Sequence, residues 1–255
     1  MNPGQQADPG LLVGRWPDDL AAASMALARR FSDHATLWCW SPRWPQHAEH
    51  VAVEFVHPVI VGKRALPAVA VADPDPVAAM RSLAEAGDVL VVVADSSTPG
   101  VEDMLRRAPA WGVETIWIGS GPRPAATLSA PRGLADHLLW FDGAGAEAPF
   151  SGAFVLVYHV LWELTHVCFE HPGLFKQPAG RAPAGDECVT DHCITCSDEG
   201  RVAEVVEANG RSTVVVRTAE GLEDVDTTLV DPVADGDLLL VHAGVAISRL
   251  DGAPA

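Results

Sequence analysis

Three of the five cysteines of this chain stand close together in the stretch DECVTDHCITCSDEG. Cys188, Cys193 and Cys196 have the spacing C-x4-C-x2-C, which can supply three ligands of a [2Fe–2S] cluster or of a zinc ion with a nearby histidine. Either closed site needs a fourth ligand, and Cys39 and Cys168 do not stand where the iron–sulfur motif places one. A Cys-x-x-Cys pair also suits redox chemistry, but such a pair normally opens a helix, and a strand-like stretch follows here. A metal site and a reactive thiolate both stay open as interpretations.

A run of hydroxyl side chains follows the most apolar strand-like stretch of the chain. Ser96, Ser97 and Thr98 stand between the stretch DVLVVVAD and a helix-like stretch that begins after Pro99. Hydroxyls and backbone N–H groups at such a junction can bind a phosphate or a carboxylate. The same residues can instead cap the helix, so we expect either an anion site or a cap.

Histidine and glutamate residues form a second candidate metal site. His50 and Glu54 are four residues apart in a segment with helical periodicity, so both lie on one face of the predicted helix. His159 and His166 are two turns apart on a later predicted helix. Imidazole and carboxylate ligands suit zinc or iron. The alternative is that these are solvated side chains on helix surfaces.

The elements that must position these residues alternate between strand and helix over the first two thirds of the chain. Such alternation predicts a parallel sheet with helices on both faces. The last strand, HLLWFDG, is expected at an edge of the sheet. The strands are expected at residues 35–40, 66–72, 88–97, 115–121 and 137–143, and the helices at 18–33, 45–58, 75–87, 99–112 and 150–171.

The last part of the chain has a different pattern. Residues 178–187, PAGRAPAGDE, lack periodicity and predict a linker. Four strand-like stretches follow, with Asn209–Gly210 as a hairpin signal, and such a series of short strands predicts a small barrel. We therefore expect an α/β domain over residues 1–177, a linker over 178–192 and a β-barrel domain over 193–255.

Composition limits the classes of function. The chain has 17 basic and 34 acidic residues and a net charge of −17, which disfavours binding to nucleic acid backbones. No run of 18 uncharged apolar residues occurs, and the first residues lack the pattern of a secretory signal. We therefore expect a cytoplasmic protein with no membrane partner, in a reducing compartment where clustered thiols serve metals or chemistry.

The α/β region resembles the sugar isomerase (SIS) domain, in its phosphoheptose isomerase-like branch, over about residues 20–171. The stretches that carry the resemblance are HVAVEFVHPVIVGKRALPAVAVA and GDVLVVVADSSTPGVEDMLRRAPAWGVETIWIGSG. The resemblance implies a flavodoxin-type sheet, a zinc site of His50, Glu54 and His159, and the ability to form a homodimer. The glutamine ligand of that family falls at Ser151. Its glycine-rich loop is replaced by CWSPRWPQ, which disfavours close approach of a sugar phosphate.

The C-terminal region resembles the HypC/HybG/HupF family of hydrogenase maturation chaperones over about residues 193–251. The resemblance rests on CSDEGRVAEVVE and on GDLLLVHAGVAI, residues 236–247. It implies an OB-like barrel that carries the Fe(CN)2CO unit of [NiFe] hydrogenases from the iron–sulfur protein HypD to the large-subunit precursor. By position, the iron ligand is Cys193 or Cys196, and His242 lies near the iron.

Two features differ from this second family. Its members expose the cysteine directly after the initiator methionine, whereas here the cysteine is internal. The stretch CITCSDEG also replaces the usual Cys-x-x-x-Pro-Gly entrance. A thiolate on a mobile entry to a rigid barrel nevertheless suits a low-spin iron that must be bound and later released.

These residues and resemblances are compatible with three functions. We expect a hydrogenase maturation chaperone that binds iron transiently, with a zinc ion in the N-terminal domain as a further expectation. The alternative is a metal-dependent sugar-phosphate isomerase or lyase that uses the barrel as a docking module. A third is a structural zinc protein built on Cys188, Cys193 and Cys196. Whether the chain is an enzyme stays open, and the sequence favours a non-catalytic chaperone.

Overall fold

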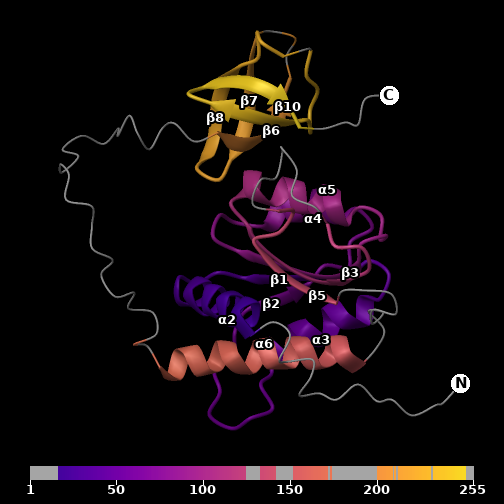
Figure 1. Cartoon of the computed structure of the whole chain (residues 1–255). Coiled ribbons are helices and arrows are strands. Elements are labelled where there is room, and N and C mark those ends of the chain that lie inside the picture. The colour runs from indigo at the N-terminus through magenta and orange to yellow at the C-terminus, as the bar shows by residue number, and fades with distance from the viewer. Residues whose placement is uncertain are drawn as a thin grey trace, which may run out of the picture. The chain divides into compact units, whose positions relative to one another are not determined.

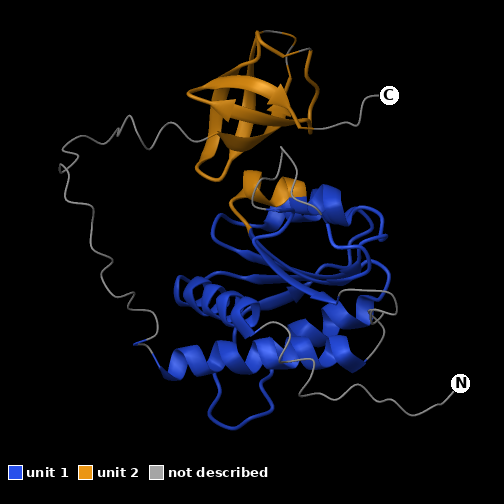
Figure 2. Ribbon diagram, in the orientation of Figure 1, with its two compact units in different colours: residues 1–105, 114–176 blue, residues 106–113, 177–255 orange. Residues whose placement is uncertain are grey.

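The computed structural model describes residues 17–124, 133–141, 152–171, 173, 200–208, 210, 212–230 and 232–250. Spatial contacts divide the chain into two compact units (Figure 2). Unit 1 comprises residues 1–105 and 114–176, and unit 2 comprises residues 106–113 and 177–255. Unit 1 is an α/β structure and unit 2 is a β-barrel, as the sequence predicts.

Unit 1 is built on a five-stranded sheet in the order β2-β1-β3-β4-β5, in which every neighbouring pair is parallel (Figure 1). This order is the flavodoxin type, and the direction of winding reverses between β1 and β3. The predicted edge position of HLLWF is confirmed. The strands are β1 (Leu37–Trp40), β2 (Ala68–Ala70), β3 (Val89–Asp95), β4 (Glu114–Ser120) and β5 (His137–Phe141).

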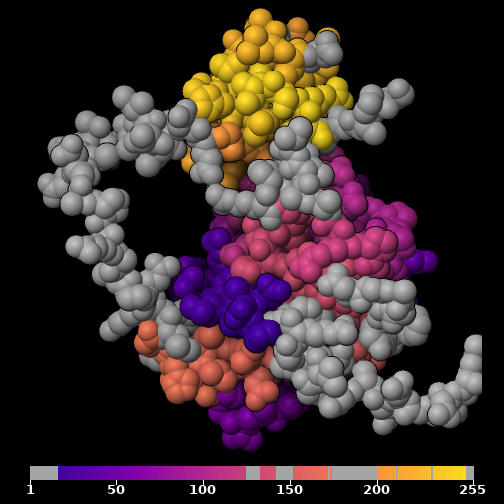
Figure 3. Space-filling view, in the orientation of Figure 1, coloured from indigo at the N-terminus to yellow at the C-terminus, as the bar shows by residue number. Residues whose placement is uncertain are grey.

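Helices cover both faces of this sheet (Figure 1). Helices α2 (Pro17–Ser32), α3 (Pro45–Val56) and α6 (Gly152–Glu170) share a core with Ile116 and Ile118 of β4. Side chains alternate along a strand, so Trp117 faces the opposite layer, which holds α4 (Pro76–Leu83) and α5 (Val101–Arg107). Helices α2 and α6 lie side by side (Figure 3).

Helix α6 is the one helix of the described residues that is long and apolar enough to cross a membrane by length and composition. Half of its most apolar stretch is buried inside the protein. The side chains of Phe154, Val157 and Leu161 lie in the core that α6 shares with the sheet. These are the properties of a core helix, and length and apolarity alone are weak grounds for a membrane span.

A glycine makes room for two indoles on the α4–α5 face. A Cβ atom at Gly119 of β4 would clash with the ring of Trp140 and lie 2.9 Å from the carbonyl oxygen of Ala94. The rings of Trp117 and Trp140 meet edge to face, with centroids 4.9 Å apart. Their N–H groups donate to the carbonyl oxygens of Ala94 and Gly121, at 2.9 and 3.0 Å. This packing requires the absence of a side chain at position 119.

Unit 2 contains a closed barrel in the order β10-β8-β7-β6-β9. Its core is aliphatic and includes Val205, Val216 and Leu239. The stretch 237–250, one strand-like segment in the sequence, divides into two strands at Ala243 and Gly244. Both residues have positive φ, 48° and 79°, as a tight hairpin turn requires. The strands are β6 (Arg201–Glu207), β7 (Thr213–Thr218), β8 (Gly221–Asp226), β9 (Leu238–His242) and β10 (Val245–Arg249).

Unit 2 also includes the short 3-10 helix η1 (Ala108–Trp111), which contacts β6 and β7. Glu204 of β6 is fully buried, and its two carboxylate oxygens accept hydrogen bonds from Arg107 Nη1 and Trp111 Nε1, each at 2.8 Å. A buried carboxylate is costly unless it is paired. Here one cation and one indole N–H meet that requirement.

Candidate functional site

The carboxyl ends of β1 and β3 form the place where ligands usually bind in a sheet of this order. Asp95, the last residue of β3, accepts hydrogen bonds at Oδ1 from Ser97 N (2.9 Å), Ser97 Oγ (2.6 Å) and Thr98 Oγ1 (3.1 Å). Its Oδ2 lies 3.3 Å from Arg43 Nη1, which comes from the loop after β1. Ser97 and Thr98, two of the three residues that the sequence assigns to an external anion, therefore donate to a carboxylate of the chain itself.

The charge state of Asp95 agrees with this arrangement. Burial raises the pKa of this carboxyl, but the hydrogen bonds from Ser97 and Thr98 and the charge of Arg43 outweigh burial and lower it below its ordinary value. The side chain of Asp95 is therefore stabilised as a carboxylate by these neighbours. An external phosphate would have to displace it, so the anion site at Ser96, Ser97 and Thr98 stays a prediction that this geometry disfavours.

The structure brings together three of the predicted metal ligands from two helices. His50 Nε2 and Glu54 Oε1, one turn apart on α3, are 3.3 Å apart. His159 Nε2 on α6 lies 3.2 Å from His50 Nε2 and 3.5 Å from Glu54 Oε1. A metal ion 2.0–2.1 Å from each ligand has tetrahedral edges of about 3.3–3.4 Å. The triangle of these three atoms matches one face of such a tetrahedron.

The three side chains of the triangle are partly accessible to solvent. The exposed fractions of the side chains are 38% for His50, 42% for His159 and 18% for Glu54. A site with three protein ligands and an accessible fourth position is typical of zinc sites that bind water or substrate. Ser151, where the family resemblance expects a further ligand, lies outside the described residues.

A buried hydroxyl stands behind His50. The hydroxyl oxygen of Tyr158 lies 2.9 Å from His50 Nδ1 and 3.4 Å from His47 Nδ1. Tyr158 and His47 are 1% and 4% exposed. Burial, followed by the charge of Glu54, raises the pKa of Tyr158 to about 12, so the phenol stays protonated. The sequence gives no sign of this contact, because 108 residues separate the two partners.

Three further residues that the sequence singles out, His166 and Cys168 on α6 and Cys39 on β1, are buried. His166 is buried, and its ring nitrogens lie 2.9 Å from the carbonyl oxygen of Trp162 and 3.0 Å from that of Arg64. It therefore does not join His159 in the metal triangle. Cys39 and Cys168 are free and buried, and burial raises the pKa of both thiols. Neither is placed as a reactive thiolate.

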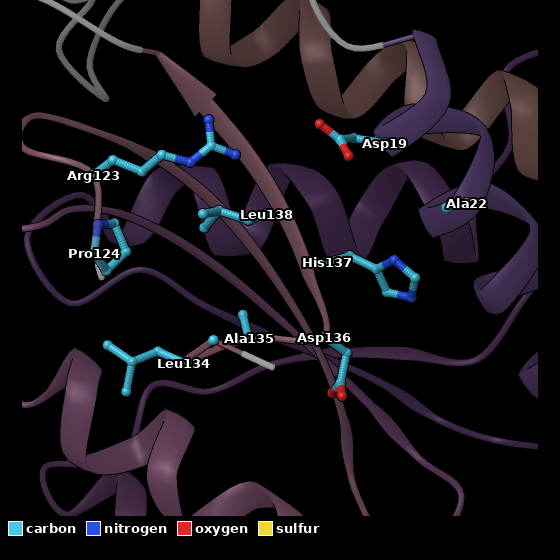
Figure 4. A pocket seen from close by; sticks show the side chains of 10 residues that line it. Asp19, Ala22, Arg123, Pro124, Leu134, Ala135, Asp136, His137 and Leu138 are labelled. Atoms are coloured by element: carbon cyan, nitrogen blue, oxygen red, sulfur yellow. The ribbon is translucent and has the colours of Figure 1, made fainter. Parts of the chain in front are cut away.

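A pocket of about 470 Å³ lies beside the start of β5 (Figure 4). Two of its polar residues, Asp136 and His137, contact residues of β4. Asp136 accepts hydrogen bonds at 2.8 Å from the backbone N–H and the hydroxyl of Thr115, and His137 Nε2 lies 3.0 Å from Glu114 Oε1. These contacts give Asp136 and His137 a structural role, and no ligand is assigned to the pocket. Its lining is Asp19, Ala22, Arg123, Pro124, Gly133, Leu134, Ala135, Asp136, His137 and Leu138.

In the barrel, strand pairing locates His242 relative to the cysteine segment. β6 and β9 are antiparallel with Arg201 opposite Val241, so the next position of this register sets Gly200 opposite His242. Gly200 lies against Leu240, which is on the same face of β9 as His242. The chain thus enters the barrel beside this histidine. Cys188, Cys193 and Cys196 themselves lie outside the described residues.

The chain joins an SIS-like α/β unit to a small closed barrel. Comparison with known proteins agrees with this description of the two folds. Residues 200–255, which include the barrel, match the family described as HupF/HypC family. This match supports a hydrogenase maturation chaperone as the general class of function and implies partners in that process. No curated protein matches the chain.

Solved structures of sugar-phosphate isomerases resemble the N-terminal region. A phosphoheptose isomerase from Francisella tularensis has a TM-score of 0.51 and 13% identity, and the match covers 62% of this chain and 90% of that one. A phosphoheptose isomerase from Neisseria gonorrhoeae has a TM-score of 0.47 and 17% identity, with 61% and 89% covered. At 13% identity the first match is evidence for a shared fold but not for a shared activity. The predicted SIS-like fold is confirmed.

Proposed function

We propose that this chain is a hydrogenase maturation chaperone that holds the Fe(CN)2CO intermediate at the entrance of its barrel. It would take this cargo from a HypD-like iron–sulfur protein and pass it to the precursor of a hydrogenase large subunit. The family match of residues 200–255 supports the proposal. The observation that carries it is the register that sets Gly200, where the cysteine segment joins the barrel, opposite His242.

Chain length allows a cysteine and this histidine to meet. Cys196 stands four residues before Gly200, and four extended residues span at most about 14 Å. Cys193 stands three residues further away and has a longer reach. Either thiolate can therefore approach His242 without any change in the barrel.

The two residue types suit the cargo. A thiolate is a soft ligand for a low-spin iron, and the cysteine must lose its proton before it binds. The imidazole of His242 can accept that proton, and it can donate a hydrogen bond to a ligand of the iron. Release to the client returns the proton to the sulfur. The rest of the ligand set belongs to the cargo and to the partner that delivers it.

Infrared spectroscopy tests this proposal directly. The full chain, purified without oxygen after co-expression with a HypD-like partner, should show bands in the cyanide and carbonyl region. Replacement of the ligand cysteine in Cys193→Ser or Cys196→Ser should abolish the bands, and His242→Ala should shift or weaken them. Cys188→Ser is the matched control from the same segment and should keep them.

Two results would reject the carrier. Bands that persist in both cysteine variants, and in the double variant, would show that the iron is held elsewhere. Stoichiometric zinc that is lost with any of Cys188, Cys193 and Cys196, in a protein without bands, would favour a structural zinc site.

For the N-terminal unit we propose a zinc or iron site formed by His50, Glu54 and His159. The near-equal triangle of their ligand atoms supports it.

The same triangle favours the second candidate function, a metal-dependent isomerase or lyase for sugar phosphates. Asp95 argues against that candidate, because it occupies the donors that would bind the phosphate. Metal-dependent turnover of sugar phosphates that is lost in His50→Ala would decide for the enzyme.

The remaining proposals concern assembly and place. We propose a homodimer formed through the SIS-like unit, because Leu156 and Val160 on α6 are apolar and only partly buried in the single chain. Sedimentation analysis of the full chain and of Leu156→Glu would test it.

We also propose a cytoplasmic location, where the chain would meet hydrogenase precursors before their assembly. Recovery of the chain with membranes or outside the cell would contradict this.

A further inference from the structure

Tyr158 has the position of an outer partner to the metal triangle, although no family resemblance assigns it a role. Its hydroxyl oxygen lies 2.9 Å from His50 Nδ1, while His50 Nε2 faces Glu54 and His159. The ring of Tyr158 meets the ring of His50 at 74°, with centroids 5.2 Å apart. Each nitrogen of His50 thus has its own neighbour, and the two cannot exchange roles without a rotation of the ring.

Proton counting shows what a metal would require of this contact. A neutral imidazole carries one proton, on one of its two nitrogens. If His50 Nε2 gives its lone pair to a metal, the proton must be on Nδ1. Nδ1–H is then a donor, and the partner at 2.9 Å is the hydroxyl oxygen of Tyr158. The tyrosine oxygen must therefore accept from His50, and its own proton must point elsewhere.

His47 supplies the place for that second proton. Its Nδ1 lies 3.4 Å from the hydroxyl oxygen of Tyr158, and both side chains are buried. The metal-ready arrangement is accordingly a directed chain from His50 Nδ1–H to the oxygen of Tyr158, and from the Tyr158 hydroxyl to His47 Nδ1. The opposite direction would place a proton on His50 Nε2 and block the metal.

We propose that Tyr158 is a positioning residue that fixes His50 in the tautomer with the proton on Nδ1, so that Nε2 is a ligand. This inference rests on the proposed metal site. Metal-bound histidines commonly donate their second N–H to an outer acceptor, and loss of that acceptor typically weakens metal binding 10- to 100-fold. A buried phenol takes the place of the more usual carboxylate or carbonyl here.

The test uses the full chain with Cys188, Cys193 and Cys196 replaced by serine, so that thiols do not compete for metal. Cobalt(II) binding is measured by titration, and nitrogen-15 NMR at a pH where His50 is neutral reports which ring nitrogen is protonated. Tyr158→Phe should bind cobalt 10- to 100-fold more weakly and lose the Nδ1–H form of His50. Thr165→Val, which removes another buried hydroxyl of α6, is the matched control and should change neither.

The outcomes separate the two proposals. Equal cobalt affinity in Tyr158→Phe and the parent, or a proton already on Nε2 of His50 in the parent, would overturn the role of Tyr158. A parent that binds no cobalt would refute the metal site itself, while the nitrogen signal would still decide the direction of the hydrogen bond. The NMR result on the parent does not depend on how well the variant folds.

Discussion

Arg43 Nη1 lies 3.3 Å from Asp95 Oδ2, and this contact links the loop after β1 to the last residue of β3, where the loop after β3 begins. These loops flank the point where the order of the sheet reverses, which is where parallel α/β proteins usually bind ligands. The contact matters because a guanidinium at this place would otherwise be available to an anionic ligand. Here a carboxylate of the same chain pairs with it.

Removal of Asp95 should therefore expose the donors that it occupies. We expect inorganic phosphate at millimolar concentration to raise the Tm of Asp95→Ser and to leave the parent unchanged, since ligand that binds only the folded state stabilises it. Asp75→Ser is the control, because Asp75, the N-cap of α4, also accepts a backbone N–H but stands outside the loops at the carboxyl ends of β1 and β3. Phosphate stabilisation of the parent would show that Asp95 does not block the loop.

The pair of Glu114 and His137 should make stability depend on pH. The hydrogen bond from His137 and the hydrogen bond and charge of Arg30 outweigh burial and lower the pKa of Glu114 from 4.5 to about 2. A lowered folded-state pKa stabilises the fold above the unfolded value, and the gain is lost as pH falls from about 4.5 to about 2. At pH 7 the gain is at most about 3 kcal/mol.

Denaturant unfolding of the parent and of Glu114→Gln from pH 2 to pH 7 checks this. The difference in unfolding free energy should be largest above pH 4.5 and should shrink below it. Glu85→Gln, at an exposed position, serves as the control and should show no such trend. A difference that does not vary with pH would mean that Glu114 titrates normally in the folded protein.

The metal triangle predicts that loss of any one of its three side chains weakens metal binding. Alanine at His50, Glu54 or His159 should each weaken cobalt or zinc binding by more than the 10- to 100-fold typical of outer partners, because each removes a direct ligand. His57→Ala, at an exposed histidine just beyond α3, is the matched control. If His57→Ala loses as much affinity as the triangle variants, binding is non-specific.

The indole packing at β4 predicts a strong effect of one methyl group. Gly119→Ala would place a Cβ against the ring of Trp140, and overpacking of this kind typically costs about 1–3 kcal/mol. Gly152→Ala, at the exposed start of α6 with nothing near its Cβ position, should be neutral or slightly stabilising. Denaturant unfolding curves of both variants measure the difference in stability. Equal midpoints would mean that the indole rings move aside without a loss of unfolding free energy.

Local pattern was enough to predict most of the fold. The run Val89–Ala94 is apolar throughout because β3 is buried on both faces, and the switch to helical periodicity after it indicates a crossover. His50 and Glu54 could be placed together because a spacing of four defines one helix face. The β9–β10 hairpin was not separated, because Ala243 gives no sequence signal for a positive φ.

Contacts between distant positions could not be predicted in this way. The spacing of residues says nothing of which loop Arg43 meets, or that Asp95 turns back onto Ser97. The closeness of His159 to His50 came from a family resemblance, and the hydroxyl of Tyr158 was missed. Such contacts depend on how helices pack, which the periodicity of one segment does not record. One signal was available: charged residues at or just after the carboxyl ends of two neighbouring strands, such as Asp95 and Arg43, are candidates for a pair.

Tyr158 is the single tyrosine of the chain, whereas tryptophan occurs eight times. Biosynthetic incorporation of 3-fluorotyrosine would consequently place one fluorine-19 nucleus in the whole protein, within reach of His50 and His47. Its resonance would respond to occupancy of the neighbouring ligand set without any assignment problem. The chain thus carries a built-in reporter position from which metal loading of the intact protein could be followed.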